Sequence, residues 1–439
     1  MVLLRAIEIQ ARLPTQSRRR LWNPLRSTLQ LTLVLLGYGL VRIAGAASGV
    51  LVGLYIADLS NHRLPVGAEL VGTLSAVSYA AELIGAFPLG VAADYISRRT
   101  LMTTGALLGG LATQLFGMSG HLSIFFLSRA LEGVAAAAIA PALLARLTDI
   151  TDGNRSLRAR AMSYFELSLL GGLGAGGLLA GHLWARLQST AFSMVAVVYL
   201  GASVCLFIGA VGGRPRPVAG RGSLAAVIRD RNIRHIAPLM LCVSAVVGLW
   251  LGPTLPYLLT HRTGSHQYIA GLYADNPSAV GWLLLGYSIV FAAGLIGWSQ
   301  FLPRMSAHRA MQVALLAMLA VCAGIGLLNN SSDYSTLARW MIGGCTAALI
   351  MVESGFTPAA LVWLTAALGP QAGRGAAMGA YSVMLGVGTI VGSLLAAALA
   401  PRFAVDGLLV ATFAMALLGL WFLRGLTPRS AGFPESSDA

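Results

Sequence analysis

Long apolar runs separated by short polar segments are the dominant pattern along the chain. A helix needs about 20 consecutive, mostly apolar residues to cross a bilayer, and twelve runs meet that requirement. We therefore predict twelve membrane-spanning helices. Their expected limits are 29–55, 69–92, 101–119, 123–147, 161–184, 190–212, 236–259, 280–302, 310–329, 335–365, 376–400 and 406–423.

The positions of the arginines predict the orientation of these helices. All 30 basic residues are arginine, and 23 of them fall on the side of the N-terminal tail, four on the opposite side and three inside spans. Cytoplasmic loops of membrane proteins are enriched in basic residues. We therefore expect a multi-pass protein of the cytoplasmic (inner) membrane with both termini in the cytoplasm.

A segment rich in glycine, proline and arginine divides the twelve spans into two groups of six, as a cytoplasmic linker would. The expected organisation is a tail, a bundle, a linker, a second bundle and a second tail. These correspond to residues 1–28, 29–212, 213–235, 236–423 and 424–439.

The two groups of spans repeat the same motifs at the same places. Arg129 and Arg339 each begin a fourth span, at an offset of 210 residues. The fifth spans carry glycine pairs at an offset of 216 residues, namely Gly172 with Gly176 and Gly388 with Gly392. Small residues at such spacing let helices pack closely. The predicted fold class is therefore all-α transmembrane, with twelve helices in two parallel-repeat six-helix bundles, which is a transporter architecture.

Three motifs resemble those of a known family. The loop after the second span reads Gly90-Val-Ala-Ala-Asp94-Tyr-Ile-Ser-Arg98-Arg99 and resembles motif A of the major facilitator superfamily, G-x-L-A-D-R-x-G-R-R. Arg129-x-x-x-Gly133 resembles the superfamily's motif B, and the glycine-rich run 172–181 resembles its motif C. The resemblance covers all twelve spans and implies the major facilitator fold.

The resemblance also implies roles for particular residues. Motif A implies a conformational switch at the cytoplasmic side, carried by Gly90, Asp94, Arg98 and Arg99. Motif B implies that Arg129 takes part in proton coupling. Motif C is associated with antiporters and implies export. The chain departs from the family where Tyr95 replaces an arginine and Ser97 a glycine of motif A, and where Gly176-Gly177 replaces the usual Gly-Pro of motif C.

Charged residues within the spans are the candidates for substrate binding or proton coupling, because charge at membrane depth costs roughly 2.5–3.5 kcal/mol on insertion scales. Structural alternatives remain open. Arg42 is a possible structural partner of Glu82, and Arg129 and Glu132, three residues apart, share a helix face on which a local ion pair can form. The seven candidates are Arg42, Glu82, Arg129, Glu132, Glu166, Arg339 and Glu353.

Composition limits the class of function. Only 10% of the residues are charged and 56% are hydrophobic, whereas soluble domains carry about 25% charged residues. We expect a monomeric secondary active transporter that moves a small amphipathic molecule by alternating access, through proton-coupled export. The alternatives are an organic-anion or nutrient transporter of the same fold, and a transport-inactive membrane sensor or scaffold. We expect no enzymatic activity, cofactor, metal site or nucleic-acid partner.

Overall fold

The computed structural model describes residues 15–62, 66–92, 95–151, 155–211, 231–262, 266–368 and 373–426, and for residues 15–27 and a few positions within helices it describes the backbone alone. These residues form helices and connecting loops, with no strand among them. A helix satisfies its backbone polar groups internally, which apolar spans in lipid require. The all-α prediction is therefore confirmed.

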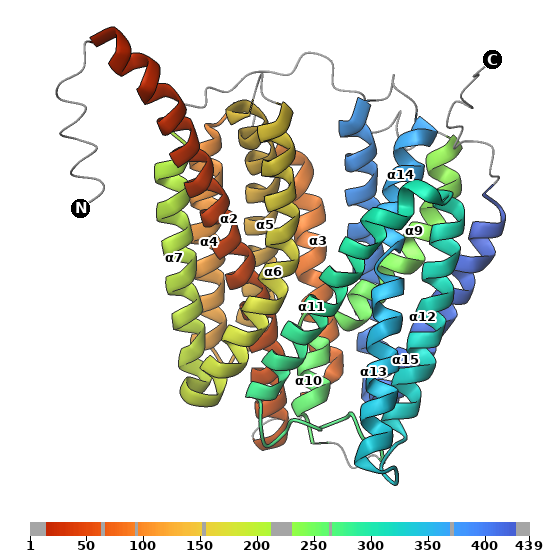
Figure 1. Cartoon of the computed structure of the whole chain (residues 1–439). Coiled ribbons are helices and arrows are strands. Elements are labelled where there is room, and N and C mark those ends of the chain that lie inside the picture. The colour runs from red at the N-terminus through yellow and green to blue at the C-terminus, as the bar shows by residue number, and fades with distance from the viewer. Residues whose placement is uncertain are drawn as a thin grey trace, which may run out of the picture.

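The helices stand in two groups side by side (Figure 1). The first group comprises α2 (Thr15–His62), α3 (Ala68–Ala92), α4 (Arg98–Met118), α5 (Leu122–Ile150), α6 (Arg155–Leu187) and α7 (Ala191–Gly209). The second comprises α9 (Arg231–Trp250), α10 (Thr254–Thr260), α11 (Ser278–Phe301), α12 (Ala307–Asn329), α13 (Thr336–Glu353), α14 (Phe356–Leu368) and α15 (Gly373–Arg424).

The described residues contain ten stretches that are long and apolar enough to cross a membrane. Two of them, Arg160–Gly209 with 50 residues and Tyr381–Arg424 with 44, are about twice the length of a single crossing. Each contains a residue with positive φ where the chain reverses, Gln188 at 49° and Ala404 at 47°. Each double stretch thus supplies two crossings, which agrees with twelve spans.

The structure corrects the limits and continuity of several spans. Helix α2 extends beyond the predicted 29–55 at both ends. The seventh span, predicted as 236–259, is broken between α9 and α10, where Gly252 has φ 93°. The tenth span, predicted as 335–365, is broken at Ser354 and Gly355, between α13 and α14. Hydropathy follows the apolarity of side chains and does not register a local change of backbone direction.

The two groups of helices meet in the halves of the helices remote from the chain termini. A Cβ on Gly72 of α3 would lie 2.7 Å from the Ala397 Cα of α15, and one on Gly177 of α6 would lie 2.8 Å from Leu284 of α11. Gly53 of α2 likewise adjoins Tyr257 of α10. Toward the termini the two groups diverge (Figure 1). We call the end remote from the termini, where α2, α6 and α10 finish, the closed end.

Candidate functional site

Four of the seven predicted charged residues gather within the first group of helices. Arg42 lies on α2, Glu82 on α3, and Arg129 and Glu132 on α5. Gly133 brings α3 and α5 together, because a Cβ there would meet the Ser78 carbonyl oxygen and lie 2.9 Å from the Glu82 nitrogen. Close packing of α3 against α5 therefore places three of these charges near one another.

Arg129 and Glu132 form an ion pair along one turn of α5. Their side chains are only 7% and 12% exposed, so each charge needs the other in its apolar surroundings. This is the local pair that their spacing makes possible. The pair is neutral as a unit, and the Arg129 Nε is left without a hydrogen-bond partner.

Arg42 and Glu82 form no direct ion pair or hydrogen bond within the described part of the chain. Both side chains are half-buried, and the charges of Arg42 and Glu132 both act on Glu82. The Arg42 Nε is buried without a partner. These two side chains thus lack an ion-pair partner among the described residues, and their charged groups remain available to a ligand or a proton.

Two tyrosines that sequence reasoning did not single out belong to this cluster. The charges of all four residues act on Tyr79, and those of Glu132, Arg129 and Arg42 act on Tyr199. Tyr79 lies three residues before Glu82, so it shares a face of α3 with it, whereas Tyr199 comes from α7 and only the tertiary fold brings it near. Hydroxyl groups beside charged groups are suited to relaying hydrogen bonds.

Glu353 lies in the second group of helices and marks the break between α13 and α14. It is half-buried and is the last residue of α13. At the break, the Trp298 Nε1 donates to the Val352 carbonyl oxygen at 2.9 Å, and the charge of Glu353 acts on Tyr287 of α11. A carboxylate at a helix break has backbone groups as well as side chains around it, as ion sites in broken transporter helices do.

Arg339 is not brought together with Glu353 or with the other candidates. It lies in the first turn of α13, at the closed end, where its Nη2 donates to the carbonyl oxygens of Ser332 at 3.1 Å and Tyr334 at 2.8 Å. Its guanidinium also lies 4.5 Å from the centre of the Tyr268 ring. These contacts fix loops at the helix end, so they correspond to a structural role.

Glu166 belongs to α6, but its side chain lies outside the described part of the molecule. The same is true of the whole of Asp94. Gly90, Arg98 and Arg99 of the motif A loop are described. A Cβ on Gly90 would meet nothing within 4 Å. Arg98 forms an ion pair with Asp149 at the end of α5, and the Arg99 guanidinium lies 3.4 Å from the centre of the Phe207 ring.

Ser97, which stands where motif A has a glycine, caps a helix. Its hydroxyl accepts a hydrogen bond from the Thr100 nitrogen at 3.1 Å and caps the N-terminus of α4. Ser306 caps α12 in the same way, through the Arg309 nitrogen at 3.3 Å. Serine at this position supplies an oxygen to otherwise unpaired backbone donors. The two halves therefore begin their third spans alike.

The four paired glycines lie where neighbouring helices are in close contact. A Cβ on Gly172 would lie 2.6 Å from the Arg42 Cβ, and Gly176 faces the Ile43 carbonyl oxygen, so both face α2. In the second half, Gly388 and Gly392 face α9. The fifth span of each half thus packs on its first span, and the glycine that adjoins Arg42 helps to position that side chain.

The Major Facilitator Superfamily profile matches residues 34–351. Multidrug resistance protein 2 of Bacillus subtilis (strain 168) is 32% identical over 147 residues, which cover 33% of this chain and 36% of that protein. Puromycin resistance protein pur8 of Streptomyces alboniger is 28% identical over 296 residues, which cover 55% of this chain and 56% of that protein. The chain therefore matches about a third and just over half of these two curated relatives.

Solved structures agree on the fold. A nucleoside transporter superposes with a TM-score of 0.70 at 12% identity, covering 90% of this chain and 98% of that one. A bacterial homolog of the human lysosomal transporter Spinster, in an inward-facing and unoccupied conformation, superposes with a TM-score of 0.67 at 13% identity. The match covers 90% of this chain and 96% of that one. A peptide transporter in complex with alafosfalin superposes with a TM-score of 0.69 at 15% identity, and the match covers 90% of this chain and 93% of that one. With its two groups of helices and a family match over most of its length, the chain belongs to the major facilitator superfamily.

Proposed function

We propose that this protein is a secondary active transporter that exports a small amphipathic molecule by alternating access, in exchange for protons. It acts in the cytoplasmic membrane as a monomer with both termini inside. Residues 29–212 and 236–423 form the two bundles that rock against each other, joined by the linker 213–235. Membership of the superfamily and the drug-resistance names of two relatives support this proposal.

The observation that carries the coupling proposal is the pair Arg42 and Glu82. Both are charged groups at the depth of the spans, both are half-buried, and neither has a hydrogen bond to a described protein group. Such groups at membrane depth are expensive unless they serve a ligand or an ion. In the proposal, Glu82 binds and releases the proton, and the nearby Arg42 changes its distance from Glu82 during the cycle.

The arginine bias of the loops supports the proposed orientation. With the termini in the cytoplasm, the closed end faces the outside and the structure corresponds to an inward-facing state. The ion pair between Arg98 and Asp149 then lies at the cytoplasmic side of the first bundle. There, together with Asp94 and Arg99, it would stabilise one state of the cycle more than the other.

The experiment is a transport assay in proteoliposomes with and without an imposed pH gradient. Puromycin is the first probe, because a relative is named for resistance to it. Accumulation that requires the gradient, and that disappears in Glu82→Gln, is the expected result. No accumulation of puromycin or of any other cationic amphipathic compound under a gradient would contradict the proposal.

An organic anion is the second candidate substrate, favoured by the unpaired Arg42 Nε. A guanidinium is suited to binding carboxylates and phosphates. The same assay decides between the two classes when labelled anions are included in the panel. Failure of every compound, with the protein folded and correctly inserted, would favour the remaining alternative of a membrane sensor or scaffold.

A further inference from the structure

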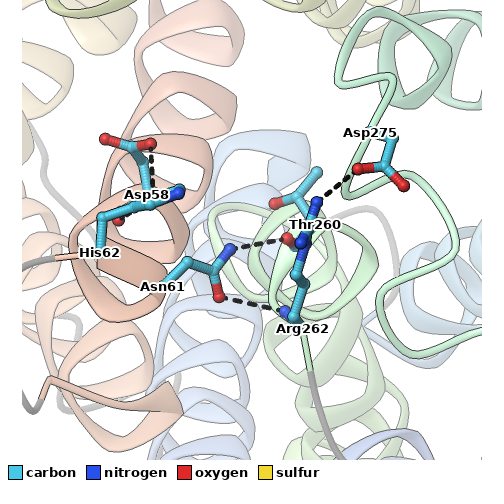
Figure 2. Close-up of polar contacts among 6 residues, drawn as sticks. All are labelled: Asp58, Asn61, His62, Thr260, Arg262 and Asp275. Carbon is cyan, nitrogen blue, oxygen red and sulfur yellow. Dashed lines mark hydrogen bonds and ion pairs between the residues drawn. The ribbon is translucent and has the colours of Figure 1, made fainter.

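A polar junction joins the two bundles at the closed end, and Figure 2 shows its residues. Asn61, at the end of α2, donates from its Nδ2 to the Thr260 carbonyl oxygen at 3.2 Å. Its Oδ1 accepts a hydrogen bond from the Arg262 nitrogen at 3.1 Å. One amide side chain of the first bundle therefore binds two backbone groups of the second, on both sides of His261.

A second contact supports this junction. Tyr257 of α10 packs against α2, because a Cβ on Gly53 would lie 3.0 Å from the Tyr257 nitrogen. Tyr257 is only 2% exposed, and its ring stacks on the His261 imidazole with the centres 4.9 Å apart and the planes at 16°. Helix α2 thus packs on α10 at Gly53 and also binds the residues on both sides of His261 through Asn61.

The segment itself is fastened to its own bundle. The Gly271 nitrogen donates to the Leu258 carbonyl oxygen at 2.9 Å, and the Tyr273 nitrogen donates to that of Leu259 at 2.8 Å. Arg262 pairs with Asp275 at 2.5 Å. Further along, the Asn329 Nδ2 donates to the Asp406 Oδ1 at 2.7 Å. The segment therefore moves with the second bundle, and opening the closed end requires the bonds to Asn61 to break.

His261 lies at the junction, and one nitrogen of its ring has no hydrogen-bond partner among the described residues. Its Nδ1 is buried without a hydrogen-bond partner, and burial lowers its pKa below the ordinary value. The titratable groups around it are Tyr257 of α10, Tyr273, and the Arg262–Asp275 pair of the loop. From the first bundle, Asp58 and His62 of α2 pair at 3.3 Å, and Glu69 of α3 acts on Tyr257. None of these groups forms a described hydrogen bond or ion pair with the His261 ring, so none of them neutralises the charge of a protonated His261.

We propose that Asn61 and the segment Thr260–Arg262 form a latch that keeps the closed end shut, and that His261 within it makes the latch acid-sensitive. The latch is a property of the fold, whereas its use during export rests on the proposed function. A buried imidazole favours its neutral form. The closed state is therefore fully stabilised above about pH 6.5, and it loses stability as the pH falls below that value. Acid outside would thus favour outward opening, where protons are to be taken up.

The test measures how often the closed end opens. A single cysteine replaces Ala397, which is 8% exposed where α15 meets α3, in a chain whose four native cysteines are serines. The rate of maleimide labelling is measured on the purified full-length protein in nanodiscs, without substrate. It is divided by the rate at an exposed reference cysteine at position 332.

Asn61→Ala removes both bonds, and we expect the normalised rate to rise roughly five- to thirtyfold. Asn61→Asp keeps the acceptor and loses the donor, so an intermediate rate is expected. The matched control is Asn330→Ala. It removes a hydrogen bond that the Asn330 side-chain amide donates to the Gly326 carbonyl oxygen of the same helix end at 2.9 Å. Equal rates in Asn61→Ala and Asn330→Ala would overturn the latch, whatever the protein transports.

The acid sensitivity is tested by the same rate between about pH 8 and 5.5. The normalised labelling rate should rise on acidification in the parent and in His62→Gln. It should stay constant in His261→Phe, because phenylalanine keeps the stacking on Tyr257 and cannot be protonated. A rise that persists in His261→Phe, or its loss in His62→Gln, overturns the role of His261. Because no substrate or gradient is used, failure of the transport assay leaves this result standing.

Discussion

At the scale of residues, spacing along a helix and packing between helices bring charges together in different ways. Arg129 and Glu132 pair because they are three residues apart on α5. Arg42 and Glu82 lie on different helices, α2 and α3, so only the tertiary fold lets the charge of Arg42 act on Glu82. The charges of the first pair neutralise each other, whereas Arg42 and Glu82 form no ion pair with any described residue and leave their charges available to a ligand or a proton.

Glu82→Gln should abolish accumulation driven by a pH gradient and leave exchange of substrate down its own gradient intact. Glutamine keeps the shape and hydrogen bonding of glutamate but cannot bind and release a proton. The measurement compares gradient-driven uptake and counterflow in the same proteoliposomes. Glu69→Gln is the matched control, because it removes an exposed carboxylate from the same helix and should change neither activity.

Glu353→Gln is the parallel variant in the other bundle. If it abolishes gradient-driven accumulation while Glu82→Gln does not, the coupling carboxylate lies at the break between α13 and α14 instead. Full pH-driven transport in both variants, and in Glu132→Gln and Glu166→Gln, would make all four carboxylates structural.

At the scale of elements, two helices of the second bundle are broken where the first bundle has continuous helices. The break before α10 places Gly252 beside the first bundle, since a Cβ there would lie 3.6 Å from the Tyr79 hydroxyl. Tyr79 in turn lies within the field of the charged cluster. The break thus lies between that cluster and the closed end, so a movement of either one would displace the other.

Gly252→Ala should destabilise the protein, because φ is 93° there and residues other than glycine are strained in that region by about 1–3 kcal/mol. The measurement is the thermal unfolding midpoint in detergent, together with the transport rate. Gly201→Ala is the control, since Gly201 lies within α7 and faces open space. An equally small effect of the two substitutions would show that the break tolerates a side chain.

At the scale of the whole molecule, the two halves repeat their packing as well as their sequence. Glycines of the fifth spans face the first spans in both halves, and serines cap the third spans in both. Small residues at the contacts at the closed end allow the bundles to approach there. The same contacts must separate for the opposite state to form, so their strength governs the balance between the two states.

Orientation is tested by labelling single cysteines in intact cells with a reagent that does not cross the membrane. A cysteine at position 333, in the exposed loop between α12 and α13, should react from outside. One at position 304, in the exposed turn after α11, should react only after permeabilisation. The reverse pattern would place the termini outside and make the closed end cytoplasmic.

The sequence by itself determined the class of the molecule. Apolar run lengths and the scarcity of charge required a membrane protein, because the bilayer sets the length and polarity of every span. The motifs from Gly90 to Gly181 identified the superfamily. The pairing of Arg129 with Glu132 was also predictable, because helix geometry fixes neighbours three residues apart.

Only the tertiary structure decided which charges share a site. Arg339 looked like Arg129 in sequence, yet it binds loop carbonyls at the closed end. Asn61 carried no signal, since its partners are backbone groups about 200 residues away, which side-chain patterns do not encode. The breaks at Gly252 and Ser354 also escaped hydropathy. Contacts between distant segments depend on how whole helices pack, and a one-dimensional pattern specifies only what lies within a few turns.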